Sequence, residues 1–205
     1  MFKNGGCLFM IMKVIIVTGS VGTGKTTISK KSANKLNFDY IDVNKVIKKY
    51  NISEGYDWKR KSKIIDIKKL NKVLIKEIAN IKDYNKKINN KIKKSIKTKN
   101  NNEKSIKIMK NQLKNIKGII IDSHLSHYLP KKYVDLCIVT KCDLKILEKR
   151  LKKRRYSKAK IRENLDAEIF DVCLSESREA GHKTIVVDTT KCIKRNLYFV
   201  LKKLS

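Results

Sequence analysis

A glycine-rich segment near the start of the chain has the residue types that bind phosphate. Gly19–Thr26 reads GSVGTGKT and matches the pattern G-x-x-x-x-G-K-[ST]. In such a loop the glycines let backbone N–H groups converge on a phosphate, and the following helix directs its positive end there. Lys25 is spaced to reach the β- and γ-phosphates of a nucleoside triphosphate, and the Thr26 hydroxyl is placed to ligate Mg²⁺. The segment therefore predicts a site for ATP and Mg²⁺.

Acidic residues at the ends of short apolar runs are candidates for holding the metal ion through water. Asp122, Asp42 and Asp188 each end such a run. We favour Asp122, because the residues that follow it, including His124, are expected on the phosphate side of the sheet. The imidazole of His124 titrates near neutrality, so it is suited to orienting a water molecule or accepting a proton. For His127 we expect a structural or solvent-facing position.

A second basic segment, Arg150–Tyr156, reads RLKKRRY. Arginine side chains above transferring phosphates neutralise charge in the transition state and exclude water. A solvated basic surface is the alternative interpretation in so basic a chain. The place of this segment, after a predicted strand and helix, favours a lid that contributes Arg154.

The elements that must position these residues alternate between strands and helices. The predicted strands are Lys13–Thr18, Phe38–Val43, Gly118–Asp122, Asp135–Thr140 and Thr184–Asp188. The predicted helices are Lys25–Leu36, Val46–Tyr50, Lys68–Ile81, Leu144–Lys153, Ser157–Ala180 and Asn196–Leu204, with a loop or small subdomain at Asn51–Ser62. This alternation implies a parallel sheet covered on both faces. The fold class is α/β, a P-loop NTPase three-layer sandwich with a five-stranded parallel sheet in a single domain.

The charge of the chain is strongly unbalanced. It has 50 Lys plus Arg against 19 Asp plus Glu, a formal net charge of +31. Such a charge favours polyanionic partners such as nucleotides, RNA or ribosomal surfaces. Twelve of the lysines lie between Tyr84 and Lys117, a segment in which isoleucines at i, i+4 spacing predict some helix, with a break at Asn100–Asn102. An AT-rich genome would produce the same Lys, Asn and Ile bias without any function.

Other features exclude some classes of protein. The five cysteines are scattered, with no CxxC pair and no zinc spacing, which is typical of reduced thiols in a cytosolic compartment. The leader Met1–Met12 is too short to span a membrane, and Met12 is a candidate for the native start. Hydrophobic residues make up 41% of the chain, which is enough for a packed core.

Several segments together resemble the isoenzyme-6 adenylate kinase family, including its archaeal members. They are GSVGTGKTT at Gly19–Thr27, EGYD at Glu54–Asp57, IIDIKKL at Ile64–Leu70, IIIDSHLSHYLP at Ile119–Pro130 and RLKKRRYSKAKIRENLDAEI at Arg150–Ile169. The last two are much more specific than the phosphate loop, which many NTPases share. The resemblance implies a nucleoside monophosphate kinase with an AMP-binding segment at 42–65 and a short lid at 153–163.

The resemblance also implies roles for individual residues. ATP contacts are implied for Gly22, Gly24, Lys25, Thr26, Thr27 and, in the lid, Arg154. Lys191 follows the fifth strand and would border the adenine. Asp122 and His124 are tied to ATP hydrolysis as well as to phosphoryl transfer, with Thr26 and Asp122 at the metal. Members of the family are similar to cytoplasmic factors that assist small ribosomal subunit maturation and rRNA processing with the ribosomal protein uS11.

Two positions and one segment depart from the family pattern. Arg155 stands where the lid usually has glycine, and Lys48 replaces an arginine common in the AMP segment. The Lys/Asn-rich stretch 83–110 is an insertion relative to compact members, and RNA contact is one interpretation of it.

The leading hypothesis is conversion of ATP and AMP to two ADP, with slower ATP hydrolysis. The alternatives are a nucleotide-switched ribosome assembly factor and a P-loop kinase for another small substrate, such as shikimate.

Overall fold

A five-stranded parallel sheet forms the centre of the fold. The computed structural model describes residues 12–58, 60, 62–97, 116–190 and 193–204. Within them the strand order is β2-β5-β1-β6-β7, and every neighbouring pair is parallel. The strands are β1 (Lys13–Thr18), β2 (Phe38–Asp42), β5 (Gly118–Asp122), β6 (Leu136–Lys141) and β7 (Thr184–Asp188). The predicted fold class and all five strands are confirmed, with ends that differ by a residue.

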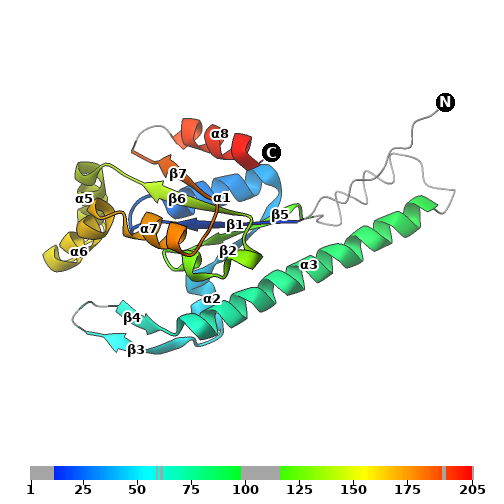
Figure 1. Cartoon of the computed structure of the whole chain (residues 1–205), viewed down its shortest axis with the longest axis horizontal. Coiled ribbons are helices and arrows are strands. Elements are labelled where there is room, and N and C mark those ends of the chain that lie inside the picture. Colours follow the sequence, from blue (N-terminus) through cyan, green and yellow to red (C-terminus); the bar gives the residue numbers. More distant parts are fainter. Residues whose placement is uncertain (1–11, 59, 61, 98–115, 191–192, 205) are drawn as a thin grey trace.

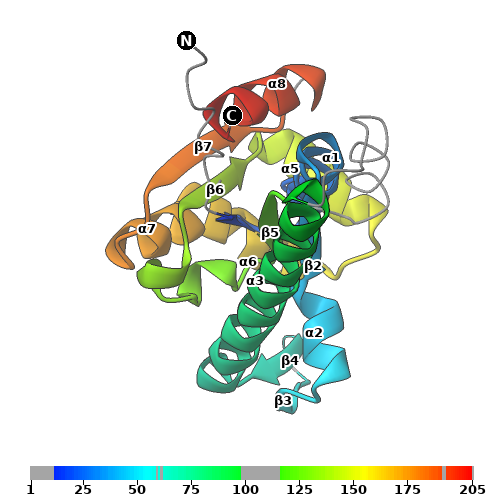
Figure 2. The ribbon, with the colours of Figure 1, turned by 90° about the vertical axis from the view of Figure 1, so that its right-hand side faces the viewer.

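Helices cover both faces of this sheet (Figures 1 and 2). They are α1 (Lys25–Leu36), α2 (Val43–Lys49), α3 (Ile67–Lys97), α7 (Val172–Glu179) and α8 (Ile193–Leu204). Ile15 and Val17 of β1 pack with residues of α1 and α8. Val14 and Ile16 pack instead with residues of α2, α3 and α7. Because successive side chains of a strand point to opposite faces, the unbroken apolar run of β1 supplies both cores.

Helix α3 joins the helix predicted for Lys68–Ile81 to the partly helical segment predicted after Tyr84. The helix expected to end at Ile81 continues to Lys97, and its 31 residues span about 46 Å. It therefore contains the start of the predicted insertion 83–110. The buried Asn85 amide holds this part against the sheet: it donates to the carbonyl of Ile116 (2.7 Å) and accepts from the N–H of the same residue (3.0 Å). Among the helices in the described ranges, none is both long and apolar enough to cross a membrane.

The helix predicted for Ser157–Ala180 is in fact two helices. After α5 (Leu144–Lys153), α6 (Lys158–Ile169) ends at a turn in which Asp171 has a φ of 53°. This left-handed residue redirects the chain into α7. Lys141 forms an ion pair with Asp171 across the turn. The periodicity of the sequence does not mark this break, because Asp and Phe interrupt no helical pattern in the way that Pro or Gly would.

The segment predicted as a loop or small subdomain forms a hairpin. Strands β3 (Ser53–Asp57) and β4 (Ser62–Ile65) are antiparallel and make a two-stranded sheet of their own. Figure 1 shows this hairpin beside α2 and the start of α3, away from the central sheet. Residues 1–11 of the predicted leader, the break expected at Asn100–Asn102 and Lys191 lie outside the described residues.

Candidate active site

The phosphate loop connects β1 to α1, the context that its sequence pattern requires. Gly19 has a φ of 137°, and a side chain there would lie 2.4 Å from the carbonyl oxygen of Thr140 on β6. Gly24 has a φ of 90° and caps the N-terminus of α1. Neither conformation is accessible to an ordinary L residue without strain. The loop therefore brings its backbone close to the neighbouring strand and opens the first turn of α1 to a ligand.

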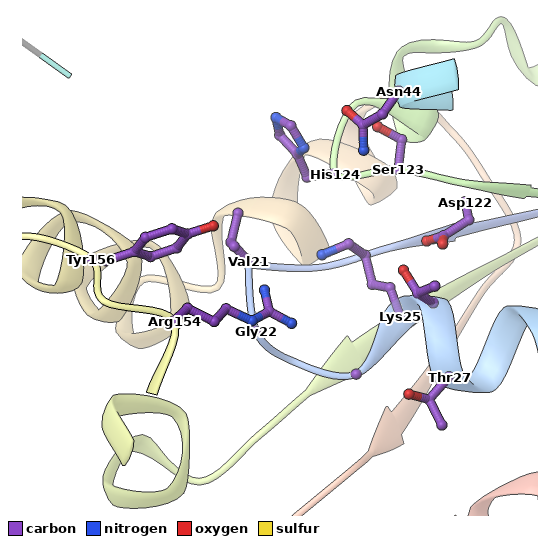
Figure 3. A pocket seen from close by; sticks show the side chains of 12 residues that line it. Val21, Gly22, Lys25, Thr27, Asn44, Asp122, Ser123, His124, Arg154 and Tyr156 are labelled. Atoms are coloured by element: carbon purple, nitrogen blue, oxygen red, sulfur yellow. The ribbon is translucent and has the colours of Figure 1, made fainter. Parts of the chain in front are cut away.

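The Lys25 side chain extends into the cavity above this loop (Figure 3). Its ammonium donates hydrogen bonds to the carbonyl oxygens of Gly19 and Ser20, both at 2.9 Å. Burial lowers the pKa of Lys25, and the nearby Asp122 carboxylate opposes that shift. A cation in a partly dehydrated cavity attracts phosphate oxygens more strongly than one in water.

The loop is braced from outside the cavity by residues that the motif does not include. Thr189, after β7, donates to the carbonyl of Thr23 at 2.5 Å. The guanidinium of Arg150 donates to the carbonyls of Thr189 (2.9 Å) and Gly22 (3.3 Å). Arg150 was grouped by its sequence with the lid, but here it links α5 to the loop. Its role is to hold the loop in shape.

The cavity has a volume of about 340 Å³ and brings together the predicted site residues. Those that line it are Gly22, Gly24, Lys25, Thr26, Thr27, Asp122, His124 and Arg154. Four further lining residues, which the sequence analysis did not single out as contacts, are Val21, Asn44, Ser123 and Tyr156. Of the predicted set, Lys191 alone falls outside the described residues.

Asp122 is the acid that faces the cavity, as predicted among the three candidates. The Tyr40 hydroxyl on β2 donates to its carboxylate at 2.8 Å. Burial, followed by this hydrogen bond, raises the pKa of the Tyr40 phenol, and the Thr26 side chain lies against the same hydroxyl. The other two acids have separate tasks: Asp42 caps α2 by accepting from Asn44 N–H (3.0 Å), and Asp188 accepts from a backbone N–H.

His124 lies on the wall of the cavity, opposite the phosphate loop (Figure 3). Desolvation in this recess, followed by the charge of Lys25, lowers the pKa of His124 to about 4. Its side chain is nevertheless open to the cavity. The imidazole is therefore neutral at physiological pH, with a nitrogen free to accept a proton or a hydrogen bond from a ligand.

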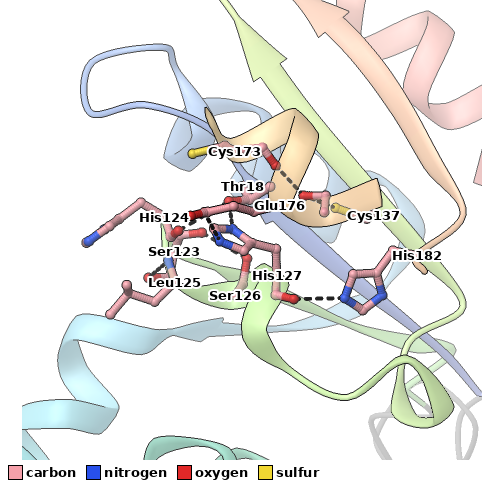
Figure 4. Close-up of polar contacts among 11 residues, drawn as sticks. Thr18, Ser123, His124, Leu125, Ser126, His127, Cys137, Cys173, Glu176 and His182 are labelled. Carbon is pink, nitrogen blue, oxygen red and sulfur yellow. Dashed lines mark hydrogen bonds and ion pairs between the residues drawn. The ribbon is translucent and has the colours of Figure 1, made fainter. Parts of the chain in front are cut away.

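His127 has a structural position, as Figure 4 shows. Its ring is buried between the hydroxyl of Thr18 (2.8 Å from Nδ1) and the carboxylate of Glu176 (2.8 Å from Nε2). His182 contacts the carbonyl of His127 at 2.9 Å. This network joins the end of β1, the loop that carries His124 and helix α7. The structural interpretation of His127 is confirmed, and the solvent-facing one is excluded.

The lid keeps the turn that a glycine would favour. Arg154 ends α5 and extends toward the loop, and Arg155 after it has a φ of 58°. A non-glycine residue in this region costs about 1–2 kcal/mol. Leu147, Leu151 and Ile161 form a small core under the lid. This packing holds the turn despite the departure from the family pattern.

A second cavity of about 320 Å³ shares Asn44 and His124 with the first. It lies along the segment expected to bind AMP. Its apolar lining consists of Ile47, Ile65, Ile67 and Leu125, and its polar lining includes Ser62, Lys48 and Lys63. Apolar side chains together with lysines suit a ligand that has both a flat ring and a phosphate.

The residues of the first cavity fit Mg²⁺ bound with a nucleotide. Magnesium in such sites takes one or two protein oxygens and several from phosphates and water. Thr26 and Asp122 offer two oxygen ligands at one end of the cavity, beside Lys25. Within the described ranges no cluster of three or more His, Cys, Asp or Glu side chains could hold a metal ion by itself. The donor set is therefore one that the phosphates of the nucleotide would complete.

A phosphate loop between strand and helix, a facing carboxylate and an arginine-bearing lid define the class of P-loop kinases. Comparisons with known proteins agree. The family model described as "AAA domain" matches residues 15–171. A Methanocaldococcus jannaschii protein named "Putative adenylate kinase" is 34% identical over 86% of this chain and 76% of its own length. The "Adenylate kinase isoenzyme 6 homolog" of Caenorhabditis elegans is 29% identical over 89% of this chain and 84% of its own.

The chain belongs to the isoenzyme-6 adenylate kinase family, a family of P-loop nucleoside monophosphate kinases. A solved structure, a sugar kinase from Janibacter sp. HTCC2649, superposes with a TM-score of 0.55 over 95% of both chains. With 15% sequence identity, that likeness shows the fold alone.

Proposed function

We propose that this protein transfers the γ-phosphoryl group of ATP to AMP and yields two ADP. The observation that carries the proposal is the pair of cavities that share His124 and Asn44. One cavity has the phosphate loop, and the other has the mixed apolar and basic lining of a nucleotide acceptor site. Substrates bound in two cavities that share lining residues would have their reacting groups close together. Such proximity accounts for much of the rate in reactions of this kind.

In the proposed reaction an oxygen of the AMP phosphate attacks the γ-phosphorus of ATP. The bond from this phosphorus to the β,γ-bridging oxygen breaks, and both nucleotides leave as ADP. Lys25 and Arg154 neutralise the charge on the transferring group from opposite sides of the cavity. Thr26 and Asp122 would hold Mg²⁺, which would neutralise further charge on the phosphates. Tyr40 keeps the Asp122 carboxylate oriented toward the cavity.

Slower hydrolysis of ATP belongs to the same proposal. With the acceptor cavity open, water can take the place of the AMP oxygen next to His124. The lowered pKa of His124, about 4, keeps the ring neutral and able to accept a hydrogen bond from that water. Part of the proposal, by family resemblance, is a cytoplasmic role in small ribosomal subunit maturation and rRNA processing, with uS11 and the pre-ribosomal subunit as partners.

A second candidate function is a nucleotide-switched assembly factor in which hydrolysis is primary and AMP transfer is incidental. The exposed lysines of α3 favour it, since they offer a surface for a polyanionic partner on an element that plays no part in the first cavity. A kinase for another small substrate would use the same donor cavity with a different acceptor.

An acceptor panel separates these functions. ADP formation from ATP·Mg²⁺ is measured with AMP, CMP, UMP, GMP and shikimate, each against the rate without an acceptor. The proposal predicts the largest stimulation with AMP. A rate that no acceptor raises would favour the assembly factor, and stimulation by shikimate alone would overturn the AMP assignment.

A further inference from the structure

The β3–β4 hairpin carries an exposed tryptophan at its turn. Trp58 directly follows β3 and is 83% exposed, and the hairpin lies apart from the central sheet (Figure 1). It is the only tryptophan among the 205 residues of the chain. Isolated exposed apolar residues are common on proteins, so the meaning of Trp58 depends on what surrounds it.

Tyr56 supports the indole of Trp58. The two rings meet at a centroid distance of 4.9 Å and an angle of 71°, an edge-to-face contact, and Tyr56 is itself 42% exposed. Such contacts contribute about 0.5–1.5 kcal/mol beyond the burial of area. Tyr56 thereby limits the orientations of the indole while most of its surface stays open.

A lysine borders this aromatic pair. Lys63 lies opposite Tyr56 in the register of the hairpin, and Ile64 lies opposite Gly55. Because neighbouring residues of a strand point to opposite faces, Lys63 shares the face of Tyr56 and Ile64 does not. The aromatic face is therefore bordered by Lys63, which also lines the second cavity. A continuous apolar patch, which a membrane or an apolar protein surface would need, is not formed there by these strands.

Helix α3, which begins directly after β4, carries further lysines. Its exposed lysines include Lys68, Lys69, Lys72, Lys76, Lys82 and Lys86. A further exposed aromatic residue, Tyr84, lies among them in the helix with 53% of its surface open. Lysines spaced along a helix and interleaved with aromatic rings suit a chain of phosphates that also carries flat bases.

We propose that the β3–β4 hairpin binds single-stranded nucleic acid, with a base stacked on Trp58 and the backbone phosphates contacting the lysines of α3. A single strand is required because the bases of a duplex are already stacked and cannot reach the indole. Stacking on an aromatic ring accepts any base, so the surface has little sequence preference. This function requires no ATP and goes beyond the proposed phosphoryl transfer.

Since Trp58 is the only tryptophan, its fluorescence reports directly on this contact. The full chain, without nucleotide, is titrated with single-stranded RNA or DNA of about 12 nucleotides, a length within the usual site sizes. Duplex RNA and heparin, a polyanion without bases, are the comparison ligands. We expect quenching by at least one of the single strands, and little or none by heparin or duplex at equal charge.

Two variants test the energetic role by anisotropy of a labelled single strand. Trp58→Ala should bind about 5- to 150-fold more weakly, because one stacked base is lost, and Trp58→Phe should recover part of the affinity. Tyr198→Ala is the matched control, since Tyr198 is 70% exposed on α8, far from the hairpin (Figure 1), and should bind like the wild type. Unchanged affinity of Trp58→Ala, or equal quenching by heparin, would overturn the proposal. If no oligonucleotide changes the indole emission, the proposal is also wrong, and a protein partner is the remaining explanation for the exposed Trp58.

Discussion

The hydroxyl of Tyr40 on β2 donates a 2.8 Å hydrogen bond to the carboxylate of Asp122 at the end of the adjacent strand β5. The two strands are paired in parallel, so their carboxyl ends meet at the edge of the sheet where the phosphate loop lies. The register thus places a fixed donor beside the acid that we expect at the metal.

Tyr40→Phe tests this relationship. A hydrogen bond to a charged group contributes about 1.5–3 kcal/mol, so the unfolding free energy should fall by up to that amount. In addition, the Mg²⁺ concentration for half-maximal activity should rise, because Asp122 loses its orientation. Tyr50→Phe is the control: its hydroxyl donates to Glu77 (2.5 Å) outside the first cavity, so it should leave the Mg²⁺ dependence unchanged. If both variants show the same Mg²⁺ dependence, Tyr40 does not orient Asp122 for the metal ion.

Asn85→Ala tests whether α3 is attached to the sheet beyond its predicted end. The change removes two hydrogen bonds to Ile116 and leaves both backbone groups of that residue without their partner. We expect a loss of about 2–4 kcal/mol in the unfolding free energy. Asn90→Ala, at an exposed position further along the same helix, should change it by less than about 0.5 kcal/mol. Chemical denaturation measures the unfolding free energy of both variants. A loss for Asn85→Ala as small as that for Asn90→Ala would contradict the attachment of α3 to the sheet.

Arg155→Gly should stabilise the protein, because it removes a side chain from a residue with a φ of 58°. The expected gain is about 1 kcal/mol, since relief of left-handed strain exceeds the extra entropy of glycine in the unfolded chain. Lys149→Gly, at an exposed position within α5, should instead cost about 1 kcal/mol. A loss of stability in Arg155→Gly would show that the guanidinium makes contacts worth more than the strain.

The pH dependence of ATP hydrolysis tests the state of His124. Its pKa of about 4 in the folded chain, against an ordinary value near 6.5, keeps it neutral above about pH 5. We therefore expect kcat/KM for hydrolysis to show no inflection from His124 between pH 8 and 5. As the pH falls, the imidazole of His124 is protonated at a higher pH in the unfolded chain than in the folded chain. His124 therefore lowers the unfolding free energy progressively between about pH 6.5 and pH 4, and has no such effect above about pH 6.5.

The variant His124→Ala extends this test to the two reactions. It should reduce hydrolysis by about 10²-fold or more and transfer to AMP by less, because bound AMP supplies its own positioned nucleophile. Equal losses would assign His124 to phosphate positioning, and no loss would make it structural. An inflection near pH 6.5 in the wild type that the variant lacks would contradict the lowered pKa.

The parts of the site that could be predicted from sequence are those formed by residues close together in the chain. The phosphate loop, with Lys25 and Thr26, is a contiguous motif, and Asp122 follows a strand whose apolar run is unmistakable. Tyr40 and Arg150 could not be assigned, because their roles depend on which strand lies next to β5 and on how α5 packs beside the loop. Such pairings join residues far apart in the chain and leave no periodic signal.

The fold, like the site, could be predicted only in part from the sequence. Four of the five strands were found because each contains a short run of Val or Ile, and β2 (FDYID) was found from its aromatic residues and its isoleucine. Some helix was predicted after Tyr84, but its continuity with the helix before it was missed, because lysines there outnumber the buried positions Asn85 and Ile88. The break between α6 and α7 was missed because Asp171 adopts a left-handed conformation without being glycine.

A labelled acceptor distinguishes phosphoryl transfer to AMP from hydrolysis of ATP. The protein is incubated with unlabelled ATP·Mg²⁺ and AMP labelled in its adenine, and the label is followed into ADP. Hydrolysis cannot move this label, so only transfer does. We predict that the label appears in ADP at a rate that Lys25→Ala lowers by about 10²- to 10³-fold, while Lys31→Ala, an exposed lysine on the same helix, leaves it unchanged. Label that stays in AMP while ATP is consumed would show that the protein hydrolyses ATP and does not transfer its phosphoryl group to AMP.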